Sequence, residues 1–395
     1  MRNFAPQMEK DMQSYRLSDL VKIKNGKDHK MLSNGKYPVL GSGGIMRYVD
    51  KFLYDKPSVL LPRKGTLDNI QYCDMPFWTV DTLYYTEVNT NLANPYYLYR
   101  YLSLLDLSNL DSGTGVPSMT FDNYYGLKIF LPNIEKQTKI AQILQTLDKK
   151  ITINRQINQN LEAMAKQLYD YWFVQFDFPN EEGKPYKSSG GEMLWNDKLK
   201  RNIPVGWHCG NLFEIAVFTN GLACQKFRPK DDEVPLPVIK IREMHDGISV
   251  DTEEVTSNIP ESVKVYNGDV LFSWSASLEV MLWAYGLGGL NQHIFKVTSA
   301  NDFPKSFYYF QLLDYVDVFK KMAEARKTTM GHITQDHLQQ STIAIPDNKD
   351  IADKFEELIS PIFKQIVKLQ EEISNLIKQR DELLPLLMNG QITIE

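Results

Sequence analysis

Apolar residues recur at alternating spacings of four and three positions over two long stretches of the chain. The first stretch starts at Ile140 and the second at Phe355. This spacing is the a/d pattern of heptad helices, which pack on one another through one apolar seam. We predict a helix–helix seam with the members Ile140, Leu144, Leu147, Ile151, Asn154, Asn158, Leu161, Leu168, Ile362, Ile366, Leu369, Ile373 and Leu376.

Amides occupy two positions of the first stretch. If they are buried, Asn154 and Asn158 would fix the register and orientation of the helix pair at some cost in stability. The alternative is that the helices splay there and water solvates both amides. The apolar members of the seam are expected to form a spacer core, so that the helices serve to set a distance.

Outside the heptad stretches, short apolar runs are broken by turns, and this outline occurs twice. An apolar run at Leu60 enters a polar loop, and a similar run at Leu271 does the same 211 positions later. The aromatic segments 96–102 and 307–313 repeat at that spacing. Each copy ends in an apolar strand and a proline that opens a heptad helix. We infer two diverged copies of one module.

Both copies predict strands with few helices. Asn25–Gly26 and Asn220–Gly221 signal turns at matching places, and Val238–Ile241 indicates a strand of the second copy. Helices are expected from Tyr96 to Leu105 and from Pro304 to about Arg326. The other connections are too short for regular βαβ crossovers, so we expect mostly antiparallel strands.

The predicted fold class is therefore α+β. We expect two similar mixed α/β domains joined by two long antiparallel coiled-coil helices, with an internal pseudo-twofold. The predicted boundaries are 1–132 for the first domain, 133–178 for a central helical spacer, 179–203 for a polar linker, 204–345 for the second domain and 346–392 for a C-terminal helical spacer.

The composition is that of an ordinary globular protein of 395 residues with 43% hydrophobic content. No apolar stretch approaches the roughly 20 residues of a membrane helix, and the N-terminus lacks the apolar core of a signal peptide, so we expect a cytoplasmic protein without membrane contact. Cys73, Cys209 and Cys224 are too few and too scattered for a disulfide framework or a zinc site.

The net charge of −5 argues at first against nucleic acid as a partner. Its distribution weakens that argument, because residues 1–132 and 133–203 each carry +2, whereas 204–345 carries −5 and 346–395 carries −4. Basic residues still cluster locally in the acidic half. A reader of DNA with this balance would depend on such clusters, or on basic partners, for phosphate affinity.

Motifs of catalysis are weak throughout. Asn94–Tyr97 comes near a methyltransferase signature but lacks its second proline and a glycine-rich cofactor loop. Glu182–Lys184 resembles the end of a nuclease site but falls in the linker, and Gly41–Gly44 is a turn pattern. His332 and His337 share a polar loop without a third metal ligand. We therefore predict a chain that binds and does not catalyse, with no metal site.

Polar loops repeated in both copies carry the candidate binding chemistry. Hydroxyls and backbone amides suit phosphate oxygens, and Arg, Lys, Gln and Asn suit base edges. The alternative for any one loop is a solvated turn. The candidate DNA-binding residues are Lys27, Lys36, Arg63, Lys64, Thr66, Ser112, Thr114, Lys226, Arg228, Lys240, Arg242, Ser273, Trp274, Ser275, Gln292, His293, Lys327, Thr328 and Thr329.

With these features in view, the chain resembles the specificity subunit of Type I restriction-modification systems over nearly its whole length. The stretches that carry the resemblance are 37–45, 61–66, 77–85, 112–137, 267–273, 290–295 and Pro346 into its helix. The resemblance implies two target-recognition domains, each reading a few base pairs of a split DNA site, with the helices fixing the unread gap. Helices of about 40 to 50 Å would span a little over one turn of B-DNA.

The resemblance also implies partners and cofactors. Two modification subunits would dock on the helices, and restriction subunits would join them to cleave unmethylated DNA. S-adenosylmethionine, Mg and ATP would then belong to the partner subunits, with no cofactor bound by this chain. Base-contacting residues vary with the target in this family, so the candidate residues above rest on their chemistry alone.

Two other hypotheses stay open at this point. One is a two-module coiled-coil scaffold that binds other proteins, and the other is a self-sufficient methyltransferase or nuclease, for which the motifs are missing. The aromatic cluster Tyr169, Tyr171, Trp172, Phe173 and Phe176 follows the first heptad stretch. We expect it to pack against the second module or helix, with docking of a modification subunit as the alternative.

Overall fold

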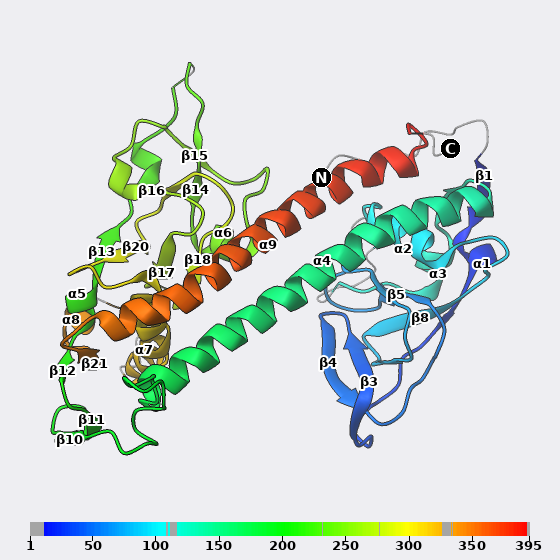
Figure 1. Cartoon of the computed structure of the whole chain (residues 1–395). Helices are drawn as coiled ribbons and strands as arrows, with labels where there is room; N and C mark the ends of the chain where they lie inside the picture. Colours follow the sequence, from blue (N-terminus) through cyan, green and yellow to red (C-terminus); the bar gives the residue numbers. More distant parts are fainter. Residues whose placement is uncertain are drawn as a thin grey trace. The chain divides into compact units, whose positions relative to one another are not determined.

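The protein is described from a computed structural model, which covers residues 12–107, 110, 117–230, 232–275, 277–325, 333 and 335–392. The chain divides into two compact units (Figure 1). Unit 1 comprises Met1–Ile151 and Leu376–Glu395, and unit 2 comprises Thr152–Asn375. Because each long helix is divided between the units, the units differ from the domains and spacers predicted from sequence.

The described residues of unit 1 form three small sheets. Their orders are β1-β9, β2-β8-β5-β6 and β4-β3-β7, and only β3 and β7 pair in parallel. Apolar runs explain the central strands, since every residue of β5 is buried. The strands are β1 (Gln13–Arg16), β2 (Val21–Lys24), β3 (Asn34–Gly41), β4 (Gly44–Val49), β5 (Ser58–Pro62), β6 (Gln71–Cys73), β7 (Trp78–Thr79), β8 (Leu83–Val88) and β9 (Lys128–Leu131).

Short helices accompany these strands in the described part of the unit: α1 (Leu17–Leu20), α2 (Pro95–Ser103) and α3 (Phe121–Tyr125). The helix predicted from Tyr96 starts one residue earlier, because the Asn94 side chain accepts hydrogen bonds from the first free N–H groups and Pro95 fits the first helical position. Buried tyrosines of α2 and α3 belong to the core of the unit.

Unit 2 repeats the order of unit 1. The sheets β12-β21, β13-β20-β17-β18 and β15-β14-β19-β16 match those of unit 1 in order, with β16 as an additional strand of the third sheet, and β14 and β19 form the parallel pair. The strands are β12 (Trp207–Gly210), β13 (Ala216–Asn220), β14 (Leu236–Ile239), β15 (Glu254–Val255), β16 (Lys264–Val265), β17 (Val270–Ser273), β18 (Glu279–Leu282), β19 (Gly288–Leu290), β20 (Ile294–Ser299) and β21 (Ile343–Pro346).

Its shorter helical elements are α5 (Leu212–Ile215), η3 (Cys224–Lys226), α6 (Ile241–Asp246), η4 (Glu261–Val263), α7 (Lys305–Ala325) and α8 (Gln335–Gln339). The repeated sheets confirm the predicted duplication, and the mixture of helices and mostly antiparallel strands confirms the predicted α+β class. One strand prediction was wrong at its end, because α6 begins at Ile241. The Lys240 N–H donates to Glu243 Oε2 at 3.2 Å, and this bond caps the new helix.

Two glycines show how closely the copies correspond. A Cβ on Gly26 would lie 2.0 Å from the Val80 carbonyl oxygen, and one on Gly221 would lie 2.2 Å from that of Asn291. In unit 1, the turn after β2 crosses the segment that precedes β8. In unit 2, the turn after β13 crosses the segment that precedes β20 in the same way. Only glycine permits the backbone to pass so close at these two places.

Replacement of Gly26 by alanine is expected to destabilise unit 1 by about 1 to 3 kcal/mol, because a backbone segment has to move. Gly43→Ala is the matched control, since a Cβ there meets nothing within 4 Å. Thermal unfolding of the three proteins checks this prediction. Equal midpoints for the two variants would show that the close approach at Gly26 is unimportant.

The long helices are α4 (Ile134–Tyr169), which continues into η2 (Asp170–Val174), and α9 (Asp350–Met388). They run antiparallel within each unit. In unit 1, Ile140 and Leu144 share a core with Leu384 and Leu387. In unit 2, the Asn158 side chain donates to the Ile366 carbonyl at 3.3 Å.

The predicted seam residues face inwards along both helices. Asn154 and Asn158 are 6% and 7% exposed, which leaves no room for the solvated alternative. Leu147, Leu161, Leu168 and Ile362 are half-buried. The fully buried members are Ile140, Leu144, Ile151, Ile366, Leu369, Ile373 and Leu376.

The segment predicted as a linker has structure of its own. It contains the hairpin of β10 (Met193–Asn196) and β11 (Arg201–Pro204), and Ile203 is buried in the core of unit 2. The aromatic cluster after α4 joins the same core, where Tyr169 stacks on Phe310 at 5.1 Å between ring centroids. Only Tyr171 of that cluster is exposed.

The described helices include none that is long and apolar enough to span a membrane. Cys73, Cys209 and Cys224 are free thiols.

Candidate nucleic-acid interface

In unit 1, the ends of two strands and the start of a third meet at one end of the sheet β2-β8-β5-β6. β8 pairs antiparallel with both β2 and β5, so the ends of β2 and β5 lie beside the start of β8. Lys24 lies opposite Tyr85, and Pro62 lies opposite Leu83. The loop that begins at Arg63 therefore leaves the sheet at the same edge as the turn after β2. We call this the loop edge of unit 1.

Arg63 is held at the loop edge by its backbone and by its side chain. Its N–H donates to the Thr82 carbonyl at 2.9 Å, and its own carbonyl accepts from the Met119 N–H at 3.0 Å. Its Nη1 donates to the Asp81 carbonyl at 3.3 Å, and the guanidinium lies 6.0 Å from the Tyr84 ring. Burial raises the pKa of Tyr84, which the charge of Arg63 opposes. A half-buried cation is thus fixed at the edge.

Four other predicted residues of unit 1 are exposed. Lys64 and Thr66 lie in the loop after β5, and Lys27 lies in the segment after β2. Lys36 lies on β3, with its ammonium 5.2 Å from the Tyr37 ring centroid. Lys27, Lys64 and Thr66 gather around the loop edge, whereas Lys36 lies towards the other end of the β3–β4 hairpin.

Unit 2 has the same edge with different side chains. The Trp274 N–H donates to the His293 carbonyl at 3.3 Å, and the Trp274 carbonyl accepts from the Ile333 N–H at 3.0 Å. Arg63 makes the equivalent pair of bonds in unit 1. The two copies therefore hold different side chains on one backbone arrangement, and this is the loop edge of unit 2.

Trp274, Gln292 and His293 form a cluster at this edge. The rings of Trp274 and His293 are 5.6 Å apart, and Gln292 Nε2 lies 3.3 Å from His293 Nε2. His293 Nδ1 is buried and has no hydrogen-bond partner among the residues that the structure describes. The cluster offers an amide, an imidazole and an indole to a ligand with mixed polar and aromatic surfaces, such as a base pair.

Two predicted serines beside this cluster are buried, and Ser273 stabilises the turn. Ser273 is fully buried, its hydroxyl donates to the Ser277 carbonyl, and it accepts from the Glu279 N–H at 3.1 Å. Ser275 is 7% exposed. Because the Ser273 hydroxyl already donates and accepts within the turn, its position speaks against the predicted contact with DNA.

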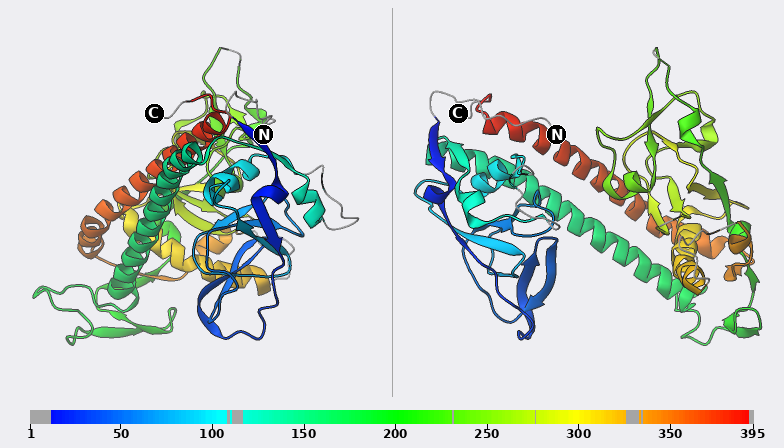
Figure 2. Two further views of the ribbon diagram at one scale, coloured as in Figure 1. Left: turned by 90° about the vertical axis from the view of Figure 1, so that its right-hand side faces the viewer. Right: turned by 180° about the vertical axis from the view of Figure 1, so that it is seen from behind.

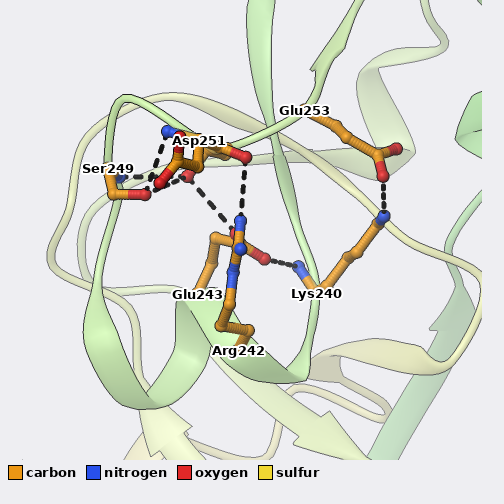
Figure 3. Close-up of polar contacts among 7 residues, drawn as sticks. Lys240, Arg242, Glu243, Ser249, Asp251 and Glu253 are labelled. Atoms are coloured by element: carbon orange, nitrogen blue, oxygen red, sulfur yellow. Dashed lines mark hydrogen bonds and ion pairs between the residues drawn. The ribbon is translucent and has the colours of Figure 1, made fainter. Parts of the chain in front are cut away.

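Two predicted cations of unit 2 lie in ion pairs (Figure 3). Lys240 Nζ lies 2.6 Å from Glu253, and the Arg242 guanidinium lies 2.7 Å from Glu243. The Arg242 guanidinium also donates to the Asp251 carbonyl at 3.0 Å. These contacts neutralise the two cations, which sequence reasoning counted as free.

The remaining predicted residues divide into two sets. Lys226 and Arg228 are exposed in the segment after β13. The others lie outside the described residues: Ser112, Thr114, Lys327, Thr328 and Thr329.

The described residues include no group of three His, Cys, Asp or Glu side chains that could hold a metal ion. His337, predicted in a polar loop, lies in α8 and is buried. Gly41–Gly44 forms the tight turn of the β3–β4 hairpin, as its sequence indicates.

Sequence reasoning missed an ionic junction in unit 1. Asp148 on α4 contacts Arg100 of α2, and its other oxygen lies 3.1 Å from Arg380 Nη1 on α9. The Tyr96 hydroxyl also donates to Asp148. Burial would raise the pKa of Asp148, but the Tyr96 hydrogen bond and both guanidinium groups hold it below its ordinary value. The junction connects α2 to both long helices. In the sequence, Arg380 in the second heptad stretch was the only indication of a buried charge there.

In unit 2, a second ionic contact links β12 to the segment before α9. His208 Nδ1 lies 2.5 Å from Asp347, and Nε2 lies 3.2 Å from Glu214. Burial would lower the pKa of His208, but its hydrogen bonds to the two carboxylates raise it above the ordinary value of 6.5. The stabilisation is therefore complete below pH 6.5 and is lost as the pH rises through the higher folded value.

We expect His208→Gln to lose this pH dependence. The wild-type protein should lose up to about 1 kcal/mol more stability than the variant between pH 6 and pH 9, because the pair is half-exposed and screened. Urea unfolding at the two pH values measures the difference. Parallel losses in both proteins would show that His208 does not titrate against these carboxylates.

Comparison with known proteins agrees with this arrangement. The family described as "Type I restriction modification DNA specificity domain" matches residues 9–163 and 204–379, once in each copy. The type I restriction enzyme MjaIX specificity subunit of Methanocaldococcus jannaschii is 25% identical over 310 residues, which cover 76% of this chain and 69% of the relative. The HindI specificity subunit of Haemophilus influenzae is 24% identical over 387 residues, covering 81% and 82%.

Among solved structures, the S subunit of a type I restriction-modification system from M. genitalium aligns with a TM-score of 0.64 at 14% identity. The alignment covers 98% of this chain and 99% of that one, and it shows a shared fold. The fold and the repeated loop edges define a protein built from two copies of one α+β module. The family match covers most of the chain, which therefore belongs to the family of type I restriction-modification specificity subunits.

Proposed function

We propose that each unit reads one half of a split DNA site through its own loop edge, and that the chain itself catalyses no reaction. The main observation that supports this proposal is that Arg63 in unit 1 and Trp274 in unit 2 make equivalent backbone hydrogen bonds but have different side chains. A duplicated reader of two unlike half-sites needs a constant scaffold and unlike contacts at the edge. Arginine suits guanine, and glutamine beside Trp274 suits adenine.

The long helices would serve as the spacer and as the docking surface of modification subunits. An apolar stripe on α4 and η2 supports docking, since Ile153, Ile157, Met164 and Tyr171 are exposed at spacings of four, seven and seven residues. Such a stripe is typical of a helix that packs on a further helix. S-adenosylmethionine would be bound by those partners, and Mg and ATP by restriction subunits where these join.

Methylation mapping tests the proposed function. DNA from cells that express the chain with its modification subunit should carry a methylated motif with two short specified halves around an unspecified gap. Cells without the chain should lack this motif. An active complex that adds no new motif would contradict the proposal and would favour a scaffold that binds proteins alone.

A further inference from the structure

Charge differs sharply between equivalent segments of the two units. Residues 21–64, from β2 to the loop edge, contain ten Lys and Arg against three Asp and Glu, a net charge of +7. The equivalent residues 216–275 contain six against ten, a net charge of −4. The net charge of the first 132 residues is only +2, because the residues outside this segment are acidic on balance. One unit thus presents a strongly basic segment, and the other does not.

Ion pairing widens the difference. In unit 2, Lys240 and Arg242 are paired with carboxylates (Figure 3), and Lys264 lies 3.2 Å from Glu261. In unit 1, Lys36 and Lys51 are exposed and form no ion pair with a carboxylate of the described residues. Lys36 and Lys51 can therefore contact phosphates without first breaking an internal ion pair, whereas Lys240, Arg242 and Lys264 of unit 2 cannot.

The β3–β4 hairpin lies within this basic segment, with Lys36 and Arg47 on its strands, and it also exposes apolar side chains. β4 lies at the edge of its sheet (Figures 1 and 2), and Ile45, Met46 and Tyr48 on it are 57%, 59% and 50% exposed. A bare apolar edge strand invites aggregation unless it has a partner. Its counterpart in unit 2, β15, is two residues long and follows an acidic turn. Within the part of the chain that the structure describes, a long exposed hairpin at this place therefore occurs in unit 1 and not in unit 2.

The hairpin turn is fastened to the loop edge of unit 1. Asn69 Nδ2 donates to the Ser42 carbonyl at 2.5 Å, and Gln71 Nε2 donates to the Gly41 carbonyl at 2.9 Å. Both side chains come from the loop and strand that follow Arg63. The exposed tip therefore continues the surface on which Arg63 and Lys64 lie, in a fixed position.

We propose that the β3–β4 hairpin is a DNA-binding ribbon. Lys36 and Lys51 near its base contact phosphates, and Ile45 and Met46 near its tip contact base edges in the groove, where a thymine methyl is the apolar feature. The major groove accepts a two-stranded ribbon of this kind. The inference rests on the proposed function and adds that unit 1 supplies most of the salt-dependent affinity.

The first test is the salt dependence of binding to a random-sequence duplex, measured with the full-length chain. Lys36→Gln with Lys51→Gln should lower the slope of log affinity against log salt concentration by about 1.8, at 0.9 per lost phosphate contact. Lys240→Gln with Lys264→Gln is the matched control and should leave the slope unchanged, because both lysines are already paired. An unchanged slope in the first variant, or equal losses in both, would overturn the proposal.

The second test concerns the tip. Met46→Ser, in complex with the modification subunit, should weaken binding to the mapped motif about tenfold and relax a specified base in one half-site only. Met46→Leu should retain both. Normal DNA binding by Met46→Ser with weaker association of the modification subunit would instead identify a protein-docking surface. If the wild-type complex methylates a split motif and the hairpin variants bind DNA unchanged, the proposed DNA-binding ribbon is wrong and the proposed function stands. If the wild-type complex methylates no split motif, the proposed function is wrong.

Discussion

Asp148→Asn is expected to lower the free energy of unfolding by about 2 to 3 kcal/mol at pH 7. The change leaves the guanidinium groups of Arg100 and Arg380 close together without their shared carboxylate, and Arg100 is only 8% exposed. Removing one partner from a buried ionic group costs more than the group contributes, because the remaining charge stays desolvated. The estimate lies below the range for fully buried pairs, since Asp148 is 27% exposed.

Asp381→Asn is the matched control, since Asp381 pairs with the same Arg380 but is mostly exposed. The Asp381→Asn variant should lose less than about 1 kcal/mol of stability.

The contribution of Asp148 depends on pH. Because the pKa of Asp148 is lowered in the folded protein, the stabilisation by Asp148 is complete above about pH 3.8 and is lost as the pH falls through the lower folded value. Urea unfolding at pH 7 should rank the two variants accordingly, and equal costs would contradict the role given to the junction.

Arg63→Ala with Lys64→Ala is expected to weaken binding to the mapped DNA motif by roughly a hundredfold. Arg63 is held by the Thr82 and Met119 backbone and presents its guanidinium at the loop edge, where a contact with a guanine would be worth about 1 to 3 kcal/mol. Lys64 is exposed beside it and would add one phosphate contact.

Lys139→Ala serves as the control for this variant, because Lys139 is exposed on α4 and paired with Glu135 at 3.6 Å. Fluorescence anisotropy with the assembled complex should show near wild-type affinity for the control. If the double variant also binds like the wild type, with a full salt slope, Arg63 and Lys64 do not face DNA.

Much of the fold followed from local pattern. The heptad spacing predicted the long helices, and the burial of Ile140, Leu144 and Ile373 lies where that spacing places it. The repeat at 211 positions predicted two copies, since hydrophobic order survives divergence when each copy keeps its core. Asn25–Gly26 and Asn220–Gly221 marked two turns whose close contacts become visible only in three dimensions.

What the sequence did not reveal depends on contacts between distant residues. Asp148 and Arg380 are 232 positions apart, so no local pattern connects them. Counting charges along the chain treated Lys240 and Arg242 as free, because their pairing depends on how α6 and the turn after it fold. The sequence predicted that the Ser273 hydroxyl faces a ligand from a loop. In the structure this hydroxyl is buried and donates to the Ser277 carbonyl in the turn that follows β17.

The same limit applies to the candidate interface. A polar loop predicts that some side chain faces a ligand, but the strand register decides which one. Pairing of Pro62 with Leu83 places Arg63 at the loop edge, and pairing of Ser273 with Ile294 does the same for Trp274. The correspondence between Arg63 and Trp274 therefore emerged from the structure.

The central claim is that each loop edge reads its own half of a split site. Methylation mapping of two edge variants, Arg63→Ala and Gln292→Ala, each with its modification subunit, tests this claim most directly. We predict that the first variant relaxes one half of the methylated motif, that the second relaxes the other half, and that the gap stays unchanged in both. Relaxation of the same half by both variants, or of neither, would contradict the account.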